Sequence, residues 1–268
     1  MPLRRRRPRA DLAMILGCQR SGTTLLGLML EAHPGVDLIE ENDDRFHPLR
    51  DGDRRLDLPA AVQHRPADGL VPVFKAPRET HRLDEIMAAR PSTRMIWIER
   101  DVRQVVASMI ELTSGQRSWA DRFARRECER HSAAHGDHAR NVADAAEELG
   151  DEQRPAAMAA LCWAVKIRQR EIAEERWPDQ VLRLDYESTV RAPASTAAAV
   201  TAFLGLRRSR SMHDHPSHVE PGARPGKTDA TRPIDTASLD RWRNLDPSQL
   251  AVIDPMVEAY RRATVPAW

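Results

Sequence analysis

The chain has 268 residues, which is enough for one α/β domain with a full hydrophobic core. Its 41 Lys and Arg residues nearly balance its 40 Asp and Glu residues, so no strong basic field points to nucleic acid as a partner. No apolar run reaches the roughly 18 residues of a transmembrane helix, so a membrane span is not expected. The three cysteines are widely spaced and odd in number, which favours a reducing, cytoplasmic compartment.

The N-terminal segment, residues 1–10, reads MPLRRRRPRA. Its basic run is not followed by an apolar stretch, so it does not have the pattern of a secretory signal. A contact with nucleic acid or with a membrane surface is the alternative to a solvated tail, and a neutral chain favours the tail. We predict a basic disordered tail at 1–10 and one domain at 11–268.

The first predicted elements are a strand, a loop and a helix. Residues 12–16 are an apolar run typical of a strand buried on both faces of a parallel sheet, and residues 25–30 predict a helix with a wide apolar face. The loop between them, Gly17–Thr24, reads GCQRSGTT. Loop N–H groups and the positive end of a following helix converge on an anion, so this unit predicts a phosphate site. An ordinary tight glycine turn is the alternative.

The spacing of Gly17 and Gly22 matches the loop that binds nucleoside triphosphates, but the next residue does not. That loop needs lysine after its second glycine, and Thr23 stands there. Thr24 keeps the final hydroxyl, and the positive charge is inside the loop at Arg20. The sequence therefore predicts a phosphate loop that lacks the lysine of triphosphate-binding loops.

A second strand, residues 36–39, is followed by Glu40 and Glu41. Ligands of open α/β sheets bind outside the carboxyl ends of the strands, so one of these acids is a candidate general base. Neighbouring residues of an extended chain point in opposite directions, so we expect only one of the two to face such a site. A solvated acidic loop is the alternative.

Residues 43–70 are polar and predict a long loop with a short helix near 59–62, whose role the sequence does not assign. A third strand, 71–74, ends at Lys75, where an ammonium could reach a phosphate or sulfate held over the sheet. The alternative is a surface lysine at the end of the strand. Arg78 is a second cation nearby.

A helix at 82–90, a strand at 95–98 and a helix at 102–112 come next. Arg100 and Ser108 lie one strand-to-helix unit apart, and a guanidinium with a hydroxyl suits a phosphate. An ordinary helix start capped by Asp101 explains that aspartate but neither Arg100 nor Ser108.

The remaining chain predicts mostly helix at 113–177, a strand at 181–184, a helix at 194–204, loops at 207–236, and helices at 238–242 and 247–262. Histidines fall close together at 131–138 and at 213–218, but glycine interrupts the first group and no cysteine accompanies the second, so no metal site is predicted. The order of elements predicts an α/β fold, a single P-loop-like domain with a mainly parallel central sheet flanked by helices.

Several of these segments resemble the sulfotransferase superfamily. The run RSGTTLL at 20–26 is similar to that family's 5′-phosphosulfate loop, and 28–42 extends the similarity. The pattern R-D-x-R-x-x-x-x-S at 100–108 resembles its 3′-phosphate site, and 181–206 resembles its late strand and helix. The likeness spans most of the chain and is closest to the tyrosylprotein-sulfotransferase-like and bacterial branch.

The resemblance implies 3′-phosphoadenosine-5′-phosphosulfate (PAPS) as sulfuryl donor, adenosine-3′,5′-bisphosphate as product and no metal. It implies Glu41 as the general base, with Lys75 and Arg20 stabilising the leaving group. A late loop that closes over the nucleotide falls at Lys227 and Arg232. The donor-binding residues are then Gln19, Arg20, Ser21, Gly22, Thr23, Thr24, Arg100, Ser108, Lys227 and Arg232.

The acceptor is a hydroxyl of a small molecule or a peptide, which the sequence does not identify, and a homodimer is left open. The histidine base and the nucleotide-stacking tryptophan of the family's cytosolic branch have no match here. A P-loop kinase using ATP is one alternative, which Thr23 argues against. A nucleotide-binding module without activity is another, which an intact Glu41 and Lys75 argue against.

Overall fold

The computed structural model describes residues 7–50, 53–67, 69–114, 117–136, 138–224 and 228–264. They form two compact units. Unit 1 comprises the described parts of Met1–Gly17, Gly22–Glu99 and Ala173–Asp235. Unit 2 comprises those of Cys18–Ser21, Arg100–Ile172 and Thr236–Trp268.

Unit 1 is built on a five-stranded sheet in which every pairing is parallel. Met14 of the central strand lies opposite Phe74 on one side and Met95 on the other. The central strand is buried at every position, as its uninterrupted apolar sequence predicts. The strands in spatial order are β2 (Val36–Ile39), β5 (Val71–Lys75), β1 (Ala13–Gly17), β6 (Arg94–Glu99) and β9 (Val181–Asp185). The predicted α/β class with a parallel central sheet is confirmed.

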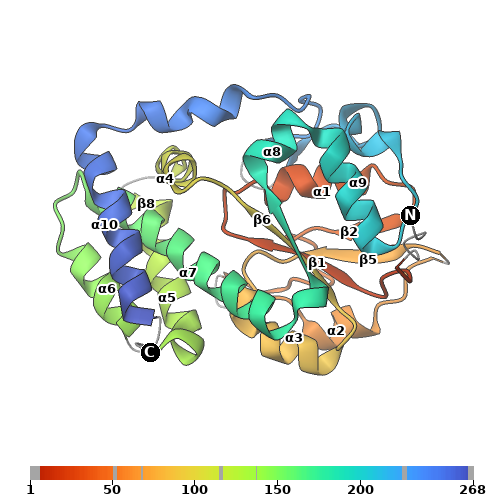
Figure 1. Cartoon of the computed structure of the whole chain (residues 1–268), viewed down its shortest axis with the longest axis horizontal. Coiled ribbons are helices and arrows are strands. Elements are labelled where there is room, and N and C mark those ends of the chain that lie inside the picture. Colours follow the sequence, from red (N-terminus) through yellow and green to blue (C-terminus); the bar gives the residue numbers. More distant parts are fainter. Residues whose placement is uncertain are drawn as a thin grey trace, which may run out of the picture. The chain divides into compact units, whose positions relative to one another are not determined.

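Helices cover both faces of this sheet. In Figure 1, α2 and α3 lie on one side of it, and α1, α8 and α9 lie on the other. Alternate residues of the strands point toward α2 and α3, and the buried cluster there includes Met14, Phe74 and Trp97. The helices are α1 (Thr23–Glu31), α2 (Leu58–Gln63), α3 (Leu83–Ala89), α8 (Tyr186–Arg191) and α9 (Pro193–Leu204), with 3-10 turns η1 (Thr80–Arg82) and η2 (Pro178–Gln180).

Three features of unit 1 differ from the sequence prediction. The polar segment 43–70 contains, besides the expected short helix, an antiparallel hairpin of β3 (Leu49–Arg50) and β4 (Asp53–Arg54). Helix α8 was not predicted, and it begins where Asp185 accepts a hydrogen bond from the backbone of Ser188. The loop-rich segment contains η3 (Arg210–Met212), η4 (His215–Ser217) and the strand pair β10 (Ala223–Arg224) and β11 (Thr228–Asp229).

Part of the predicted tail belongs to unit 1. The Ala10 amide donates to the Leu204 carbonyl at 3.0 Å, and Arg94 donates to the Pro8 carbonyl at 2.7 Å. Residues 7–10 of the predicted tail are therefore part of unit 1, and residues 1–6 lie outside the described part of the chain.

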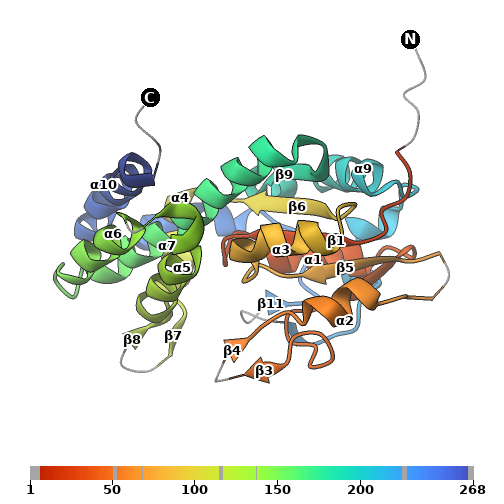
Figure 2. The same ribbon diagram turned by 90° about the horizontal axis from the view of Figure 1, so that it is seen from below.

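Unit 2 is helical. In Figures 1 and 2, α6 lies beside both α5 and α10. The prediction of helix at 113–177 is confirmed for most of that range but is wrong at its start, where β7 (Thr113–Ser114) and β8 (Arg117–Ser118) form a hairpin. The helices are α4 (Val102–Ile110), α5 (Trp119–His135), α6 (His138–Glu147), residues 154–172 of α7 (Arg154–Arg176), the 3-10 helix η5 (Ala237–Asn244) and α10 (Pro247–Thr264).

The core of unit 2 is mostly aliphatic, with a few aromatic side chains, and contains all three cysteines as free thiols. Asp101 caps the start of α4 by accepting from the amides of Arg103 and Gln104, at 2.9 and 3.3 Å. Within the described residues, no helix combines the length and apolar character needed to cross a membrane.

Candidate active site

Two glycines bound the predicted phosphate loop, and both are required by close packing in unit 1. Gly17 has φ 140°, and a Cβ there would lie 2.4 Å from the Ile98 carbonyl oxygen. Gly22 has φ 98°, and a Cβ there would lie 2.3 Å from a ring carbon of Tyr186. Neither distance is compatible with a side chain, so the loop can approach β6 and α8 only with glycine at these positions. Tyr186 therefore packs against the loop at Gly22.

The middle of the loop, Cys18–Ser21, belongs to unit 2. Arg20 has φ 71°, and among the described residues it is the only non-glycine with a positive φ. The left-handed conformation costs such a residue about 1–2 kcal/mol. The Ser21 amide donates to the Cys18 carbonyl at 3.1 Å, so the segment turns tightly around this strained residue. Strain of this kind concentrates at functional sites.

The structure brings Arg20 together with the two residues predicted to hold a second phosphate. Arg20 Nε donates to Ser108 Oγ at 3.0 Å, and Arg100 donates to the Arg20 carbonyl at 3.1 Å. Arg100 also donates to the Ser238 carbonyl at 2.7 Å. All three contacts lie within unit 2. They show that Arg100 holds the backbone of the strained loop residue, while its role at a phosphate stays a prediction.

A second predicted group lies in unit 1, around the buried ammonium of Lys75. Lys75 Nζ is 3.0 Å from Thr24 Oγ1, 3.0 Å from Glu40 Oε2 and 3.1 Å from Glu41 Oε1. The loop hydroxyl, the lysine and the candidate base, each singled out from sequence, are therefore in contact through one cation.

The expectation that only one of the two acids faces this site is wrong. Strand β2 ends at Ile39, and the Asp43 amide donates to the Glu40 carbonyl at 3.0 Å. Because the chain already turns at Glu40, the alternation of an extended strand no longer applies there. Glu40, the other candidate acid at the end of this strand, therefore contacts the same ammonium as Glu41.

Three further residues of unit 1 surround Glu41. Arg78 Nε lies 3.6 Å from Glu41 Oε2, and Arg78 also donates to Asp53 Oδ1 of β4 at 3.2 Å. His47 is buried, and its burial lowers the pKa to about 4, helped by the charges of Arg78 and Arg54 and opposed by Glu41 and Asp43. His47 is therefore neutral near pH 7. No sequence signal pointed to Asp53 or His47, since both come from the polar segment without periodicity.

The last predicted donor-binding residues lie near the end of unit 1. Arg232 is exposed, and its guanidinium binds the Asp235 carboxylate at 2.8 Å. Lys227 lies outside the described residues. Gln19, Ser21 and Thr23 are buried at the loop.

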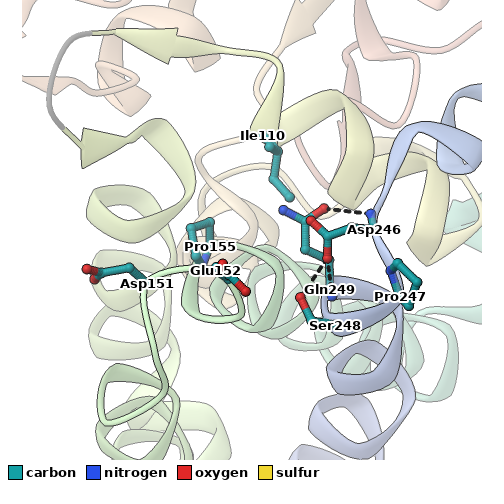
Figure 3. Close-up of a pocket in the computed structure, with 8 residues that line it drawn as sticks. All are labelled: Ile110, Asp151, Glu152, Pro155, Asp246, Pro247, Ser248 and Gln249. Atoms are coloured by element: carbon teal, nitrogen blue, oxygen red, sulfur yellow. Dashed lines mark hydrogen bonds between the residues drawn. The ribbon is translucent and has the colours of Figure 1, made fainter.

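Unit 2 also contains a pocket of about 520 Å³, which Figure 3 shows in close-up. Asp246 at its edge caps α10, accepting from Ser248 Oγ at 2.6 Å and from the Gln249 amide at 3.0 Å. None of the predicted site residues is among its lining residues, and three carboxylates do not suit an anionic donor. The pocket is lined by Ile110, Asp151, Glu152, Pro155, Asp246, Pro247, Ser248 and Gln249.

The histidines on α5 bind protein groups. His131 Nδ1 is 2.8 Å from the Glu127 carbonyl, and His135 contacts Tyr260 Oη at 2.6 Å and Gln169 Oε1 at 2.9 Å. Throughout the part of the chain that the structure describes, no group of three or more His, Cys, Asp or Glu residues is arranged to hold a metal ion.

A parallel sheet whose first strand leads through a glycine-bounded loop into a helix defines a phosphate-loop α/β fold. Within that class, a family model described as "Sulfotransferase family" matches residues 13–68 and 44–210, which is more than half of the chain. The chain belongs to the sulfotransferase family, whose members transfer sulfuryl groups. None of the curated proteins matches it.

Solved structures show the same fold at low sequence identity. The sulfotransferase domain of the Synechococcus PCC 7002 olefin synthase is 17% identical, with a TM-score of 0.55 over 93% of this chain and 95% of that one. The sulfotransferase domain from the curacin biosynthetic pathway is 14% identical, with a TM-score of 0.54 over 94% and 98%. Mouse sulfotransferase SULT7A1, solved in complex with PAP, is 15% identical, with a TM-score of 0.57 over 95% and 86%.

Proposed function

We propose that this chain transfers a sulfuryl group from PAPS to an acceptor hydroxyl, with Glu41 as general base. The observation that carries the proposal is the Lys75 ammonium, 3.0 Å from the loop hydroxyl of Thr24 and 3.1 Å from the Glu41 carboxylate. A cation at this place can stabilise the negative charge on the leaving group, while the neighbouring base removes the proton of the acceptor hydroxyl.

In the proposed reaction the acceptor oxygen attacks sulfur, and the bond from sulfur to the bridging oxygen of the 5′-phosphate breaks. Glu41 takes the acceptor's proton. Lys75, Thr24 and the loop residue Arg20 stabilise the negative charge on the departing adenosine-3′,5′-bisphosphate. Lys75 has to turn from the carboxylates toward the bridging oxygen when the donor binds, which leaves Glu41 freer to accept a proton. Positioning and electrostatics then account for the rate, and the proposal needs no metal.

The donor's 3′-phosphate is assigned to Arg100 and Ser108. The contacts of Arg20 with Ser108 and of Arg100 with the Arg20 backbone support this assignment, because they gather two guanidinium groups and a hydroxyl in unit 2. Lys227 and Arg232 are proposed to close over the nucleotide. The acceptor is proposed to be a small molecule or a peptide, and the three free thiols agree with a cytoplasmic enzyme.

The test is thermal unfolding with adenosine-3′,5′-bisphosphate, with ATP and Mg²⁺, and with AMP. A ligand at about one hundred times its dissociation constant adds about 2.7 kcal/mol of stability. We expect the bisphosphate alone to raise the Tm, and Ser108→Ala to weaken this effect. Ser132→Ala on α5, whose hydroxyl donates to the nearby Glu129 carbonyl and accepts from the Arg140 guanidinium, is the matched control. Equal or greater stabilisation by ATP would refute PAPS as donor, and incubation with ³⁵S-labelled PAPS and a panel of hydroxyl acceptors then tests turnover.

A further inference from the structure

We propose that Asp53 and Arg78 form a positioning pair that orients Glu41 and sets the pH range in which it acts as a base. This inference rests on the proposed role of Glu41 in sulfuryl transfer. It adds two residues of this chain that neither the motifs nor the family resemblance assigns.

Glu41 has a cation beside each of its two carboxylate oxygens. Lys75 Nζ lies 3.1 Å from one carboxylate oxygen, Oε1, and Arg78 Nε lies 3.6 Å from the other, Oε2. The side chain of Glu41 is mostly buried. Two cations on different oxygens fix the rotation of the carboxylate more firmly than either contact alone, because turning the group would break both.

Arg78 is itself shared with a second acid. Its NH1 group donates to Asp53 Oδ1 at 3.2 Å, and Asp53, on β4, is almost fully buried. The other oxygen of Asp53 faces Arg55 at 3.8 Å. The charge of Arg78 is therefore divided between Glu41 and Asp53, and the hairpin of β3 and β4 gains a function as the support of this pair.

The charges of Arg78 and Asp53 affect how readily Glu41 accepts a proton. A cation beside a carboxylate favours its ionised form and weakens its tendency to take a proton. In the proposed mechanism Lys75 turns to the donor, so Arg78 becomes the cation that remains beside Glu41, and an arginine keeps its charge at every working pH. Asp53 offsets part of that charge. Glu41 is then a stronger base than it would be beside an arginine whose charge is not shared.

Other charged and titratable groups also lie near this cluster. Glu40 shares Lys75 with Glu41, and His47 faces Glu41, Arg78, Asp43 and Arg54. Because burial holds the pKa of His47 near 4, it carries no charge at an assay pH of 6 to 9. The neutral histidine fills space beside the base without adding a third cation.

The experiment compares kcat/KM against pH for wild type, Arg78→Gln and Asp53→Asn. Removing the Arg78 charge should move the acidic limb of the profile to higher pH by about one unit, and neutralising Asp53 should move it to lower pH by a similar or smaller amount. If Arg78 and Asp53 had a merely structural role, both substitutions would lower the rate, but the acidic limb would not move in opposite directions. Arg50→Gln on the same hairpin replaces an exposed arginine that lies 3.9 Å from Asp57, and it should leave the limb in place.

A second readout separates this inference from the proposed function. The side-chain carboxyl resonance of Glu41, assigned in ¹³C-glutamate-labelled protein by its loss in Glu41→Gln, reports the titration midpoint without any turnover. Opposite shifts of this midpoint in the Arg78 and Asp53 variants support the pair even if no transfer from PAPS occurs. Unshifted midpoints, or shifts in the same direction, overturn the inference even if wild type is an active sulfotransferase.

Discussion

Replacing Lys75 with methionine should affect both stability and turnover, because this buried ammonium neutralises two acids and contacts the phosphate loop. Methionine keeps most of the side chain's volume and removes its charge. It leaves Glu40 and Glu41, each within 3.1 Å of Nζ in the wild type, as neighbouring carboxylates without that cation.

The size of the effect follows from these distances. Two unit charges 3 Å apart interact by about 5 kcal/mol at an effective dielectric constant near 20, and by about 1.4 kcal/mol with the screening of bulk water. Breaking a buried ion pair by removing one partner typically costs about 3–5 kcal/mol. We therefore expect Lys75→Met to unfold at a clearly lower denaturant midpoint. We also expect kcat to fall by about a hundredfold to a thousandfold, the usual cost of one lost donor to a developing charge.

The two effects can be separated with a second substitution. Glu40→Gln removes one of the two carboxylate charges while leaving Glu41 intact. In the double variant Lys75→Met/Glu40→Gln, about half or more of the lost stability should return, and kcat should stay low. Chemical denaturation gives the free energy of unfolding, and single-turnover transfer from labelled PAPS gives the rate.

Two results would refute this reasoning. If Lys75→Met retains wild-type stability, the ammonium does not neutralise the acid pair as the distances indicate. If the double variant recovers the rate together with the stability, Lys75 acts only on the fold, and its proposed contact with the leaving group is wrong.

The other predictions concern the base, the loop and the helical unit. Glu41→Gln should lower kcat by about a hundredfold to ten-thousandfold in the same transfer assay while Glu40→Gln lowers it less than tenfold, and the reverse order would make Glu40 the base. Gly22→Ala should abolish the stabilisation by adenosine-3′,5′-bisphosphate in thermal unfolding, because its Cβ would lie 2.3 Å from the Tyr186 ring; unchanged stabilisation would show that this approach is not needed. Burial lowers the folded-state pKa of His135 to about 4, below the roughly 6.5 of an unfolded chain, so the unfolded state binds more protons in between. The folded state therefore loses stability as pH falls from 6.5 to 4, and the loss from this one group amounts to ~3 kcal/mol. In His135→Gln this loss is absent, so the free energy of unfolding should depend less on pH over that range.

The elements nearest the phosphate loop could be predicted because their signals are local. The strand at 12–16 is apolar at every position, and the glycines mark the turn, so β1, the loop and α1 follow from a few neighbouring residues. The hairpin at 113–118 could not be predicted in the same way. Its two-residue strands are too short for any periodicity, and the helical patterns after it dominate the segment.

The site was predictable where a motif placed its residues and not where distant segments meet. Glu41 and Lys75 each follow a predicted strand, and parallel strands bring their carboxyl ends to one edge of the sheet. Asp53 and Arg78 come from a hairpin and a turn without a pattern, so their contact depends on how the polar segment 43–57 folds back. Two backbone hydrogen bonds hold this segment in its folded-back conformation, one from the Asp57 amide to the Phe46 carbonyl and one from the Arg55 amide to the Pro48 carbonyl.

The phosphate loop lacks the motif lysine, and in unit 1 a lysine from a neighbouring strand takes its place beside the loop hydroxyl. In triphosphate-binding loops the lysine precedes the final hydroxyl residue, and here Thr23 occupies that position, buried. The ammonium that meets the final hydroxyl comes instead from the end of β5, where Lys75 donates to Thr24 at 3.0 Å. A cation on the loop itself is fixed to the bound phosphates, whereas one on β5 can also bind the acids that follow β2. This arrangement couples the loop hydroxyl to Glu41 through a single charge, so substitutions at Thr24 and Glu41 should be non-additive in kcat, as a double-mutant cycle would measure.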